Sequence, residues 1–353
     1  MKKRISILVI IIVTIFIHSG CSLGESRTIN QTQAVVNISY PDFQMYFIDE
    51  GTPYTGIGFN IVEKYNESLV EPGHLSLETP QDEIVISVSN AFYQKLPVLL
   101  TVFYNYEQVS FQVAGDDEYR TTFIFNLESG YQVNIPIQLS SELEINDHLN
   151  SLMIGVFENP EELTKNVNPL YIGGSFHLVL NWSVSYNGEN QLVLPVPYQE
   201  PTRQLRFGGV GIIANPCYTK VIGEYQDGVN EVEFIHETSL LTASPGEVIE
   251  FSFFVNPLTS TDFGEPIFDY LIITMLDWQQ VSKSGQPYLF VEGRYDDLVR
   301  GIGDYITFTI TMPDEPGLYE FISFVVPNPT TFNNEINDWP FEMGRPFTIL
   351  IIE

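Results

Sequence analysis

Cysteine and basic residues are scarce in this sequence, and both shortages restrict what the protein can be. Only 2 of the 353 residues are cysteine, so a framework of disulfides is excluded and the fold must be held by its hydrophobic cores. Lysine and arginine number 15 against 45 acidic residues, a formal net charge of −30. Nucleic-acid binding needs clustered cations, so this composition predicts no nucleic-acid partner.

Catalytic and metal-binding motifs are also missing. The sequence has no Gly-x-Ser-x-Gly motif, no phosphate loop and no dinucleotide loop. The histidines at 74, 148, 177 and 236 are not spaced as zinc ligands, and Cys217 is read as a buried structural thiol. We therefore predict a protein that is not an enzyme, with no catalytic residue and no cofactor. The alternative is an envelope hydrolase that uses two of the many carboxylates as a pair.

The N-terminus has the order basic, apolar and small that is typical of a secretory signal peptide. Met1-Lys2-Lys3-Arg4 precedes an apolar run over 5–17, which ends at His18-Ser19-Gly20-Cys21. The run is shorter than the ~20 residues that span a bilayer. Ser19-Gly20-Cys21 resembles the end of a bacterial lipoprotein signal, although His18 stands where that family usually has leucine.

The lipoprotein resemblance implies cleavage before Cys21 and a diacylglycerol on its thiol. The chain would then be lipid-anchored on the extracytoplasmic face of a cell membrane, inner or outer. Loss of Lys2, Lys3 and Arg4 from the 15 basic residues would leave 12 against 45 acidic ones, a net charge of −33. Secretion without a lipid is the alternative.

Composition along the chain predicts five segments. These are a signal peptide at 1–20, a tether at 21–33, a first domain at 34–196, a linker at 197–207 and a second domain at 208–353. The boundary rests on three prolines between Pro195 and Pro201, which cannot continue a central strand.

Both domains have the alternating pattern of short strands. Strands are expected over 83–89, 98–104, 109–113, 121–125, 131–135, 151–157 and 175–186 in the first domain. In the second they are expected over 231–236, 248–255, 270–275, 288–291, 305–311, 318–326 and 347–352. Asn187-Gly188 predicts a hairpin turn. About seven strands per domain indicate an all-β protein with two tandem antiparallel sandwiches.

The segment Met312-Pro313-Asp314-Glu315-Pro316-Gly317-Leu318-Tyr319 resembles the turn before the penultimate strand of immunoglobulin-like domains. That resemblance implies a tyrosine corner, in which the Tyr319 ring is buried and its hydroxyl bonds to nearby backbone after the Gly317 turn. Tyr319 and Gly317 are therefore assigned structural roles. The resemblance is to an architecture and implies no function.

Two kinds of ligand site are considered. Acidic loops at 116–118, 227–231, 296–304 and 333–338 could bind Ca²⁺, but none matches the twelve-residue calcium loop, and solvated turns are the simpler explanation. The rings of Trp278, Trp339, Tyr104 and Tyr106 could form a platform for a sugar or a protein. For Trp278 and Trp339 the favoured alternative is that they plug the ends of the second sandwich.

The leading interpretation is a lipid-anchored, non-enzymatic binding or structural module of the cell envelope. Its partners would be the membrane and an envelope protein or glycan. A carbohydrate-binding surface protein is the second interpretation.

Overall fold

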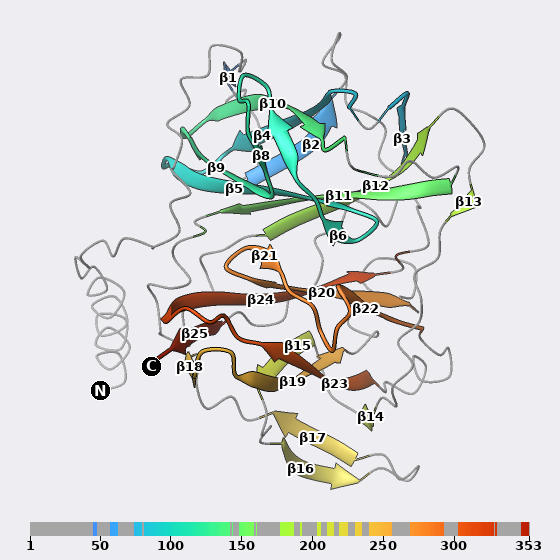
Figure 1. Ribbon diagram of the computed structural model, residues 1–353, viewed down its shortest axis with the longest axis vertical. Coiled ribbons are helices and arrows are strands. Elements are labelled where there is room, and N and C mark those ends of the chain that lie inside the picture. The colour runs from blue at the N-terminus through green and yellow to red at the C-terminus, as the bar shows by residue number, and fades with distance from the viewer. Residues whose placement is uncertain are drawn as a thin grey trace, which may run out of the picture. The chain divides into compact units, whose positions relative to one another are not determined.

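The computed structural model describes most of residues 74–158 and several later parts of the chain. The described segments are 45–47, 57–62, 74–79, 81–141, 143, 148–158, 160, 177–186, 191–192, 203–205, 210–214, 219–224, 230–234, 240–255, 269–292, 303–327, 329 and 347–352. Within these segments every regular element is a strand (Figure 1). The expected all-β class is confirmed.

The first sandwich contains two sheets (Figure 1). One has the order β2 (Ile57–Val62), β4 (Ile84–Asn90), β10 (Tyr131–Leu139), β7 (Phe111–Val113) and β8 (Tyr119–Arg120), and β1 (Met45–Phe47) also pairs with β10. The other has the order β3 (His74–Leu77), β12 (His177–Tyr186), β11 (His148–Glu158), β5 (Leu96–Tyr104) and β6 (Glu107–Gln108), with β9 (Thr122–Leu127) on β5 and β13 (Gln191–Leu192) on β11.

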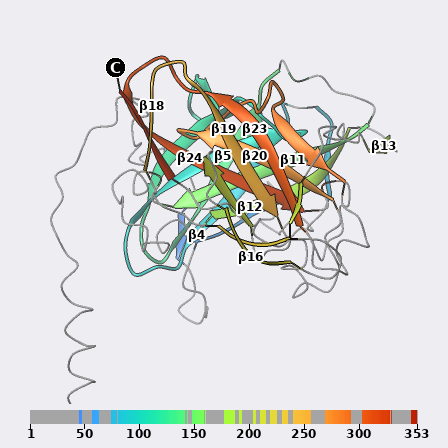
Figure 2. The ribbon, with the colours of Figure 1, turned by 90° about the horizontal axis from the view of Figure 1, so that it is seen from below.

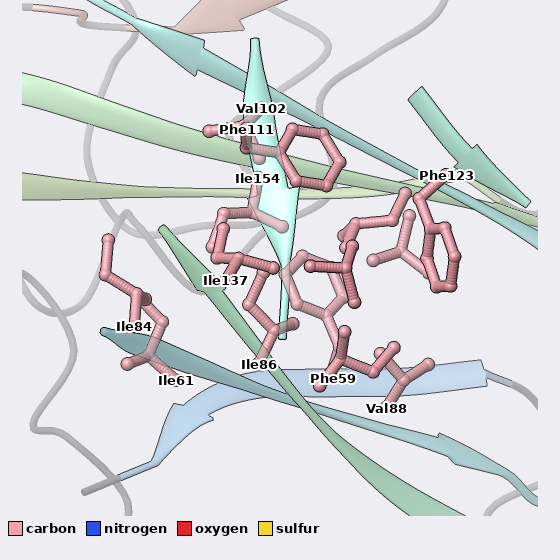
Figure 3. Close-up of a cluster of buried hydrophobic side chains, with 14 of the residues drawn as sticks. Phe59, Ile61, Ile84, Ile86, Val88, Val102, Phe111, Phe123, Ile137 and Ile154 are labelled. Atoms are coloured by element: carbon pink, nitrogen blue, oxygen red, sulfur yellow. The ribbon is translucent and has the colours of Figure 1, made fainter. Parts of the chain in front are cut away.

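Apolar side chains from the facing surfaces of these sheets form the first core. Figure 3 shows Phe59, Ile86 and Val88 from the β4 sheet packed toward Val102 and Ile154 from the β5 sheet. The alternation of apolar residues along β4, β5 and β10 puts one row of side chains into this core, as the period of two predicts. All five of these residues are at most 8 % exposed.

The second sandwich repeats this arrangement. One sheet has the order β14 (Arg203–Leu205), β23 (Gly303–Thr311), β19 (Val248–Val255) and β15 (Val210–Ala214); Figure 2 shows β19 and β23 side by side. The other has the order β18 (Leu240–Ala243), β25 (Phe347–Ile351), β24 (Gly317–Pro327), β20 (Tyr270–Leu276) and β21 (Gln279–Gln280), with β22 (Tyr288–Val291) on β20. A separate two-stranded sheet joins β16 (Thr219–Glu224) and β17 (Asn230–Phe234).

Strand pairing in both sandwiches follows the immunoglobulin pattern. Neighbours β4 and β10 in the first correspond to β19 and β23 in the second, the B–E pair of that fold. The trios β5, β11, β12 and β20, β24, β25 correspond to C, F and G. In each sandwich a short strand, β3 or β18, also runs parallel to the last of the three. The tandem immunoglobulin-like architecture is therefore present.

Two local pairings depart from the simplest sequence interpretation. Strand β14 lies within the segment 197–207 that we predicted as a linker, and it pairs with β23 of the second sandwich. The Asn187-Gly188 turn lies outside the described residues. The strand that follows it, β13, pairs in parallel with β11. Both sandwiches belong to one compact unit, Val35–Glu353.

Candidate functional site: the interface between the sandwiches

Strands β5 and β11 are buried on both faces. Val98 and Leu100 of β5 point into the first core, whereas Leu99 and Phe103 belong to a different apolar cluster. All four side chains are fully buried. A strand that is apolar on both faces must be covered on both sides, so a second layer lies against this sheet.

The β20–β24 sheet of the second sandwich provides that layer. The inter-sandwich interface consists of Leu99, Phe103, Tyr106, Met153 and Phe157 from the first sandwich and Leu271, Ile273, Met275, Trp278, Phe290, Ile322, Phe324 and Val326 from the second. Phe103 and Phe324 meet edge to face with centroids 5.9 Å apart. Phe157 and Trp278 approach to 4.9 Å. Aromatic contacts of this kind each contribute roughly 0.5–1.5 kcal/mol beyond area burial.

Two matched hairpin turns place an aromatic ring at each side of this interface. Asn105 and Tyr106 between β5 and β6 have φ of 49° and 68°, and Asp277 and Trp278 between β20 and β21 have φ of 49° and 63°. Positive φ at both central residues is the type I′ geometry that suits two-residue hairpins. This conformation is unusual for an aromatic residue. Burial of Tyr106 and Trp278 in the inter-sandwich interface compensates for it.

Gln108 and Gln280, two residues after each of these aromatics, bind one another reciprocally. The Gln108 amide N–H donates to Gln280 Oε1 at 2.6 Å, and the Gln280 amide N–H donates to Gln108 Oε1 at 2.8 Å. Gln108 Nε2 donates to the Trp278 carbonyl at 2.8 Å, and Gln280 Nε2 donates to the Tyr106 carbonyl at 2.9 Å. Each bond thus has a counterpart with the two sandwiches exchanged. This is the reciprocity of an isologous dimer contact, here within one chain.

The contact behind each turn is also repeated, with different chemistry. In the first sandwich the Asn105 N–H donates to the Ser151 carbonyl at 2.8 Å, and the Ser151 N–H donates to Asn105 Oδ1 at 2.9 Å. In the second, the Asp277 N–H donates to the Glu320 carbonyl at 2.8 Å, and the Glu320 N–H donates to Asp277 Oδ1 at 3.0 Å. A neutral pair in one sandwich therefore corresponds to two acids in the other.

Burial controls the ionisation of the acids. Burial raises the pKa of Glu320 well above its ordinary value, and the nearby Asp277 raises it further, while a hydrogen bond with Trp278 opposes the shift. Burial also raises the pKa of Asp277, opposed by the bond from the Glu320 backbone. At Tyr106, burial raises the pKa, and the hydroxyl donates to the carbonyl of Pro329.

The aromatic residues that the sequence suggested as a ligand platform are mostly buried. Trp278 is 8 % exposed, Tyr104 6 % and Tyr106 4 %. Stacking against a ligand from solvent needs an exposed ring face, so these three side chains do not offer one in this structure. Trp339 lies outside the described residues.

Tyr319 lies beside the turn expected of a tyrosine corner. Its hydroxyl donates to the Glu315 carbonyl at 2.7 Å, four residues upstream. Its ring packs against the second core but is only partly buried, which differs from the buried ring that we expected. A Cβ at Gly317 would lie 3.3 Å from the Tyr319 ring, so glycine allows this close approach. Cys21, the expected lipidation site, lies outside the described residues.

The described residues contain no group of three or more His, Cys, Asp and Glu side chains arranged to hold a metal ion. Of the acidic loops, 116–118 is described; there Asp116 pairs with Arg120, which neutralises part of its charge. Loops 227–231, 296–304 and 333–338 are largely outside the described residues. In the described part of the chain, no helix has the length and apolar character needed to cross a membrane.

Comparison with known proteins finds only distant structural similarity. No protein-family model matches the sequence, and no curated protein matches it. The C-terminal domain of the Streptococcus pyogenes antigen I/II-family protein AspA is 8 % identical, with coverage of 84 % of this chain and 99 % of that one and a TM-score of 0.22. A Salmonella enterica SafA pilin–SafB chaperone structure is 12 % identical, with coverage of 85 % and 98 % and a TM-score of 0.23. Red sea bream transglutaminase is 8 % identical at a TM-score of 0.20, and the match spans 32 % of its length. The fold assignment therefore rests on the strand pairing described above.

Sequence reasoning missed the inter-sandwich interface, although the sequence carries two signals of it. The runs 96–104 and 270–276 are almost continuously apolar, which indicates strands covered on both faces. Each run is followed by Asn or Asp, an aromatic residue, one polar residue and glutamine, at 105–108 and 277–280. These hairpins are the repeated unit of the interface.

Proposed function

We propose that this protein is a lipid-anchored, extracytoplasmic component of a bacterial cell envelope, without enzyme activity, in which the two sandwiches act as one rigid binding or structural module. The observation that carries the structural part is the reciprocal Gln108–Gln280 contact beside the apolar interface. An apolar sheet-to-sheet contact with matched hydrogen bonds opposes rotation of one sandwich against the other, whereas flexibly linked domains have small polar interfaces.

The anchoring part of the proposal is supported by the N-terminal sequence. A diacylglycerol at Cys21 would hold the body to a membrane, because two acyl chains give firm attachment at about 0.8 kcal/mol per buried methylene. The large excess of acidic residues favours a body that stays away from anionic headgroups. Together these features suit a spacer or a presenting scaffold at the envelope surface.

Substitution of each cysteine tests the anchor. Cells that express the full chain, Cys21→Ser or the matched control Cys217→Ser are labelled with a palmitate analogue and fractionated. We expect label and membrane association for the wild type and Cys217→Ser, and loss of both for Cys21→Ser. Labelling that survives in Cys21→Ser would show that the anchor assignment is wrong.

Two further measurements test the location and the non-enzymatic role. A membrane-impermeant amine reagent should modify the protein on intact cells or spheroplasts, since Lys95 is about half exposed. A glycan array and a glycosidase panel should both be negative with the full chain. Specific glycan binding would support the carbohydrate-binding alternative, and turnover would support the hydrolase.

A further inference from the structure

Glu320 is the least expected side chain in the inter-sandwich interface. On β24, residues Ile322, Phe324 and Val326 point into that interface, and the period of two puts Glu320 on the same face. Its side chain is 3 % exposed, and Oε1 has no hydrogen-bond partner. A buried ionised carboxylate with an unpaired oxygen costs several kcal/mol, so the group is stable there mainly when protonated.

Asp277 adds a second carboxyl group beside it. The Asp277 Oδ1 atom is 3.0 Å from the Glu320 backbone nitrogen, and its neighbour Trp278 packs on Phe157 across the interface. Two neighbouring carboxylates in a poorly solvated place do not both ionise readily. The proton balance of this pair is therefore coupled to whether the two sandwiches are in contact.

The first sandwich shows that the fold does not need these acids. Asn105 and Ser151 make the same two backbone contacts in the equivalent hairpin without an ionisable group. The Ser151 hydroxyl is also satisfied, because it donates to Asn181 Oδ1 at 2.6 Å. The acidic pair therefore adds titratable groups to this hairpin contact, which the neutral pair does not have.

We propose that Glu320, with the Asp277 carboxyl group as its neighbour, holds a bound proton in the closed inter-sandwich interface, and that this proton makes the contact between the two sandwiches sensitive to pH. When the proton is released, negative charge appears beside the Trp278–Phe157 contact, and separation of the sandwiches lets water solvate it. Acidic conditions therefore tighten the interface and alkaline conditions loosen it.

Among the described residues around Asp277 and Glu320, no basic side chain and no set of metal ligands competes with a proton for these two carboxyl groups. Trp278 supplies a hydrogen bond to Glu320 from the turn, and β25 brings the Thr348 backbone opposite Glu320. Tyr319 and Glu315 lie on the Asp277 side, where Glu315 adds further negative charge. Among the described residues neither acid forms an ion pair, and no third metal-ligating side chain joins them. Calcium prefers six to eight oxygens, which two carboxyl groups do not provide.

The direction of the effect follows from linkage. In the closed interface the pKa of Glu320 is raised above its value in an exposed chain. The contact therefore stabilises the closed state fully at pH values below the ordinary pKa of glutamate, and this stabilisation is lost as pH rises through the raised pKa. One proton changes the opening equilibrium by at most about tenfold per pH unit across this window.

Amide hydrogen exchange of the full chain tests the proposal. Exchange at the backbone N–H groups of Gln108 and Gln280 is followed from about pH 5 to about pH 9 and corrected for intrinsic rates. Each of these N–H groups donates across the interface in the closed state. We expect the opening constant to rise at least about tenfold over this range in the wild type. Glu320→Gln, the neutral isostere, should remove the rise. Glu292→Gln, which removes an exposed carboxylate from the same sandwich, should behave as wild type.

Two further measurements complete the test. The wild-type infrared spectrum should show a protonated carboxyl band at neutral pH that Asp277→Asn shifts to lower pH, by removal of the neighbouring charge. This readout needs only the wild type if Glu320→Gln does not fold. The proposal is overturned if Glu320→Gln keeps the wild-type pH slope, if no protonated carboxyl is seen at neutral pH, or if added Ca²⁺ closes the interface at high pH and a chelator opens it.

Discussion

Alanine substitution of Gln108 and Gln280, singly and together, measures how strongly the sandwiches are held in register. Gln108→Ala removes two bonds that cross the interface, one to the Gln280 N–H and one to the Trp278 carbonyl. Gln280→Ala removes the two counterparts. A neutral hydrogen bond contributes about 1 kcal/mol net, so each single variant should lose about 2 kcal/mol of unfolding free energy.

The double variant should lose less than the sum of the singles. Once one glutamine is removed the hairpins separate more easily, and the remaining bonds contribute less. We expect a coupling energy of about 1 kcal/mol, within the range for contacting residues, and a total loss of about 3 kcal/mol. Both side chains are only partly buried, so water relieves part of the cost of the unpaired groups.

Urea unfolding of the full chain, followed by circular dichroism and tryptophan fluorescence, gives these free energies. Gln138→Ala is the matched control, because Gln138 is an exposed glutamine on β10 and should change stability by less than about 0.5 kcal/mol. The reasoning fails if the two single variants match this control, or if their losses add to within about 0.5 kcal/mol. Separate transitions for the two sandwiches would also refute a shared cooperative interface.

Three other variants test local features, each by the pH or urea dependence of unfolding. Tyr319→Phe should lower the free energy of unfolding by about 1 kcal/mol through loss of the bond to the Glu315 carbonyl, and Tyr319→Ala should lower it by roughly 2 kcal/mol, less than for a fully buried aromatic residue. If neither variant loses stability, Tyr319 has no tyrosine-corner role. Gly155→Ala should lower the free energy of unfolding by about 1–3 kcal/mol, because the added Cβ would lie 2.8 Å from the Phe157 ring and 3.0 Å from Thr101 Cγ2. An unchanged urea midpoint would contradict this packing. Burial lowers the pKa of Lys283 to about 7, so between about pH 7 and about pH 10.5 the unfolded chain binds more protons than the folded one, and the stability of the wild type rises with pH. Lys283→Met should flatten that rise. An identical slope in the variant would mean that the amine is solvated.

Several features of the fold were available from local sequence pattern. Alternating residues over 83–89 and 248–255 predicted strands that the structure contains at Ile84–Asn90 and Val248–Val255, because period-two alternation follows directly from strand geometry. The Pro316-Gly317 turn before Tyr319 located the start of β24. The scarcity of cysteine required cores like those that the two sandwiches contain.

The partners of each strand and each ring were decided only by tertiary structure. The sequence placed Trp278 and Tyr106 after apolar strands but could not distinguish an exposed platform from a buried contact. The ring that packs on each of them, Phe157 on Trp278 and Tyr288 on Tyr106, is more than 100 positions away in the chain. The same holds for Gln108 and Gln280, whose hydrogen bonds exist only when two hairpins meet. Local pattern fixes the direction in which a side chain points, whereas burial, pairing and the ionisation of Glu320 depend on which surface packs against it.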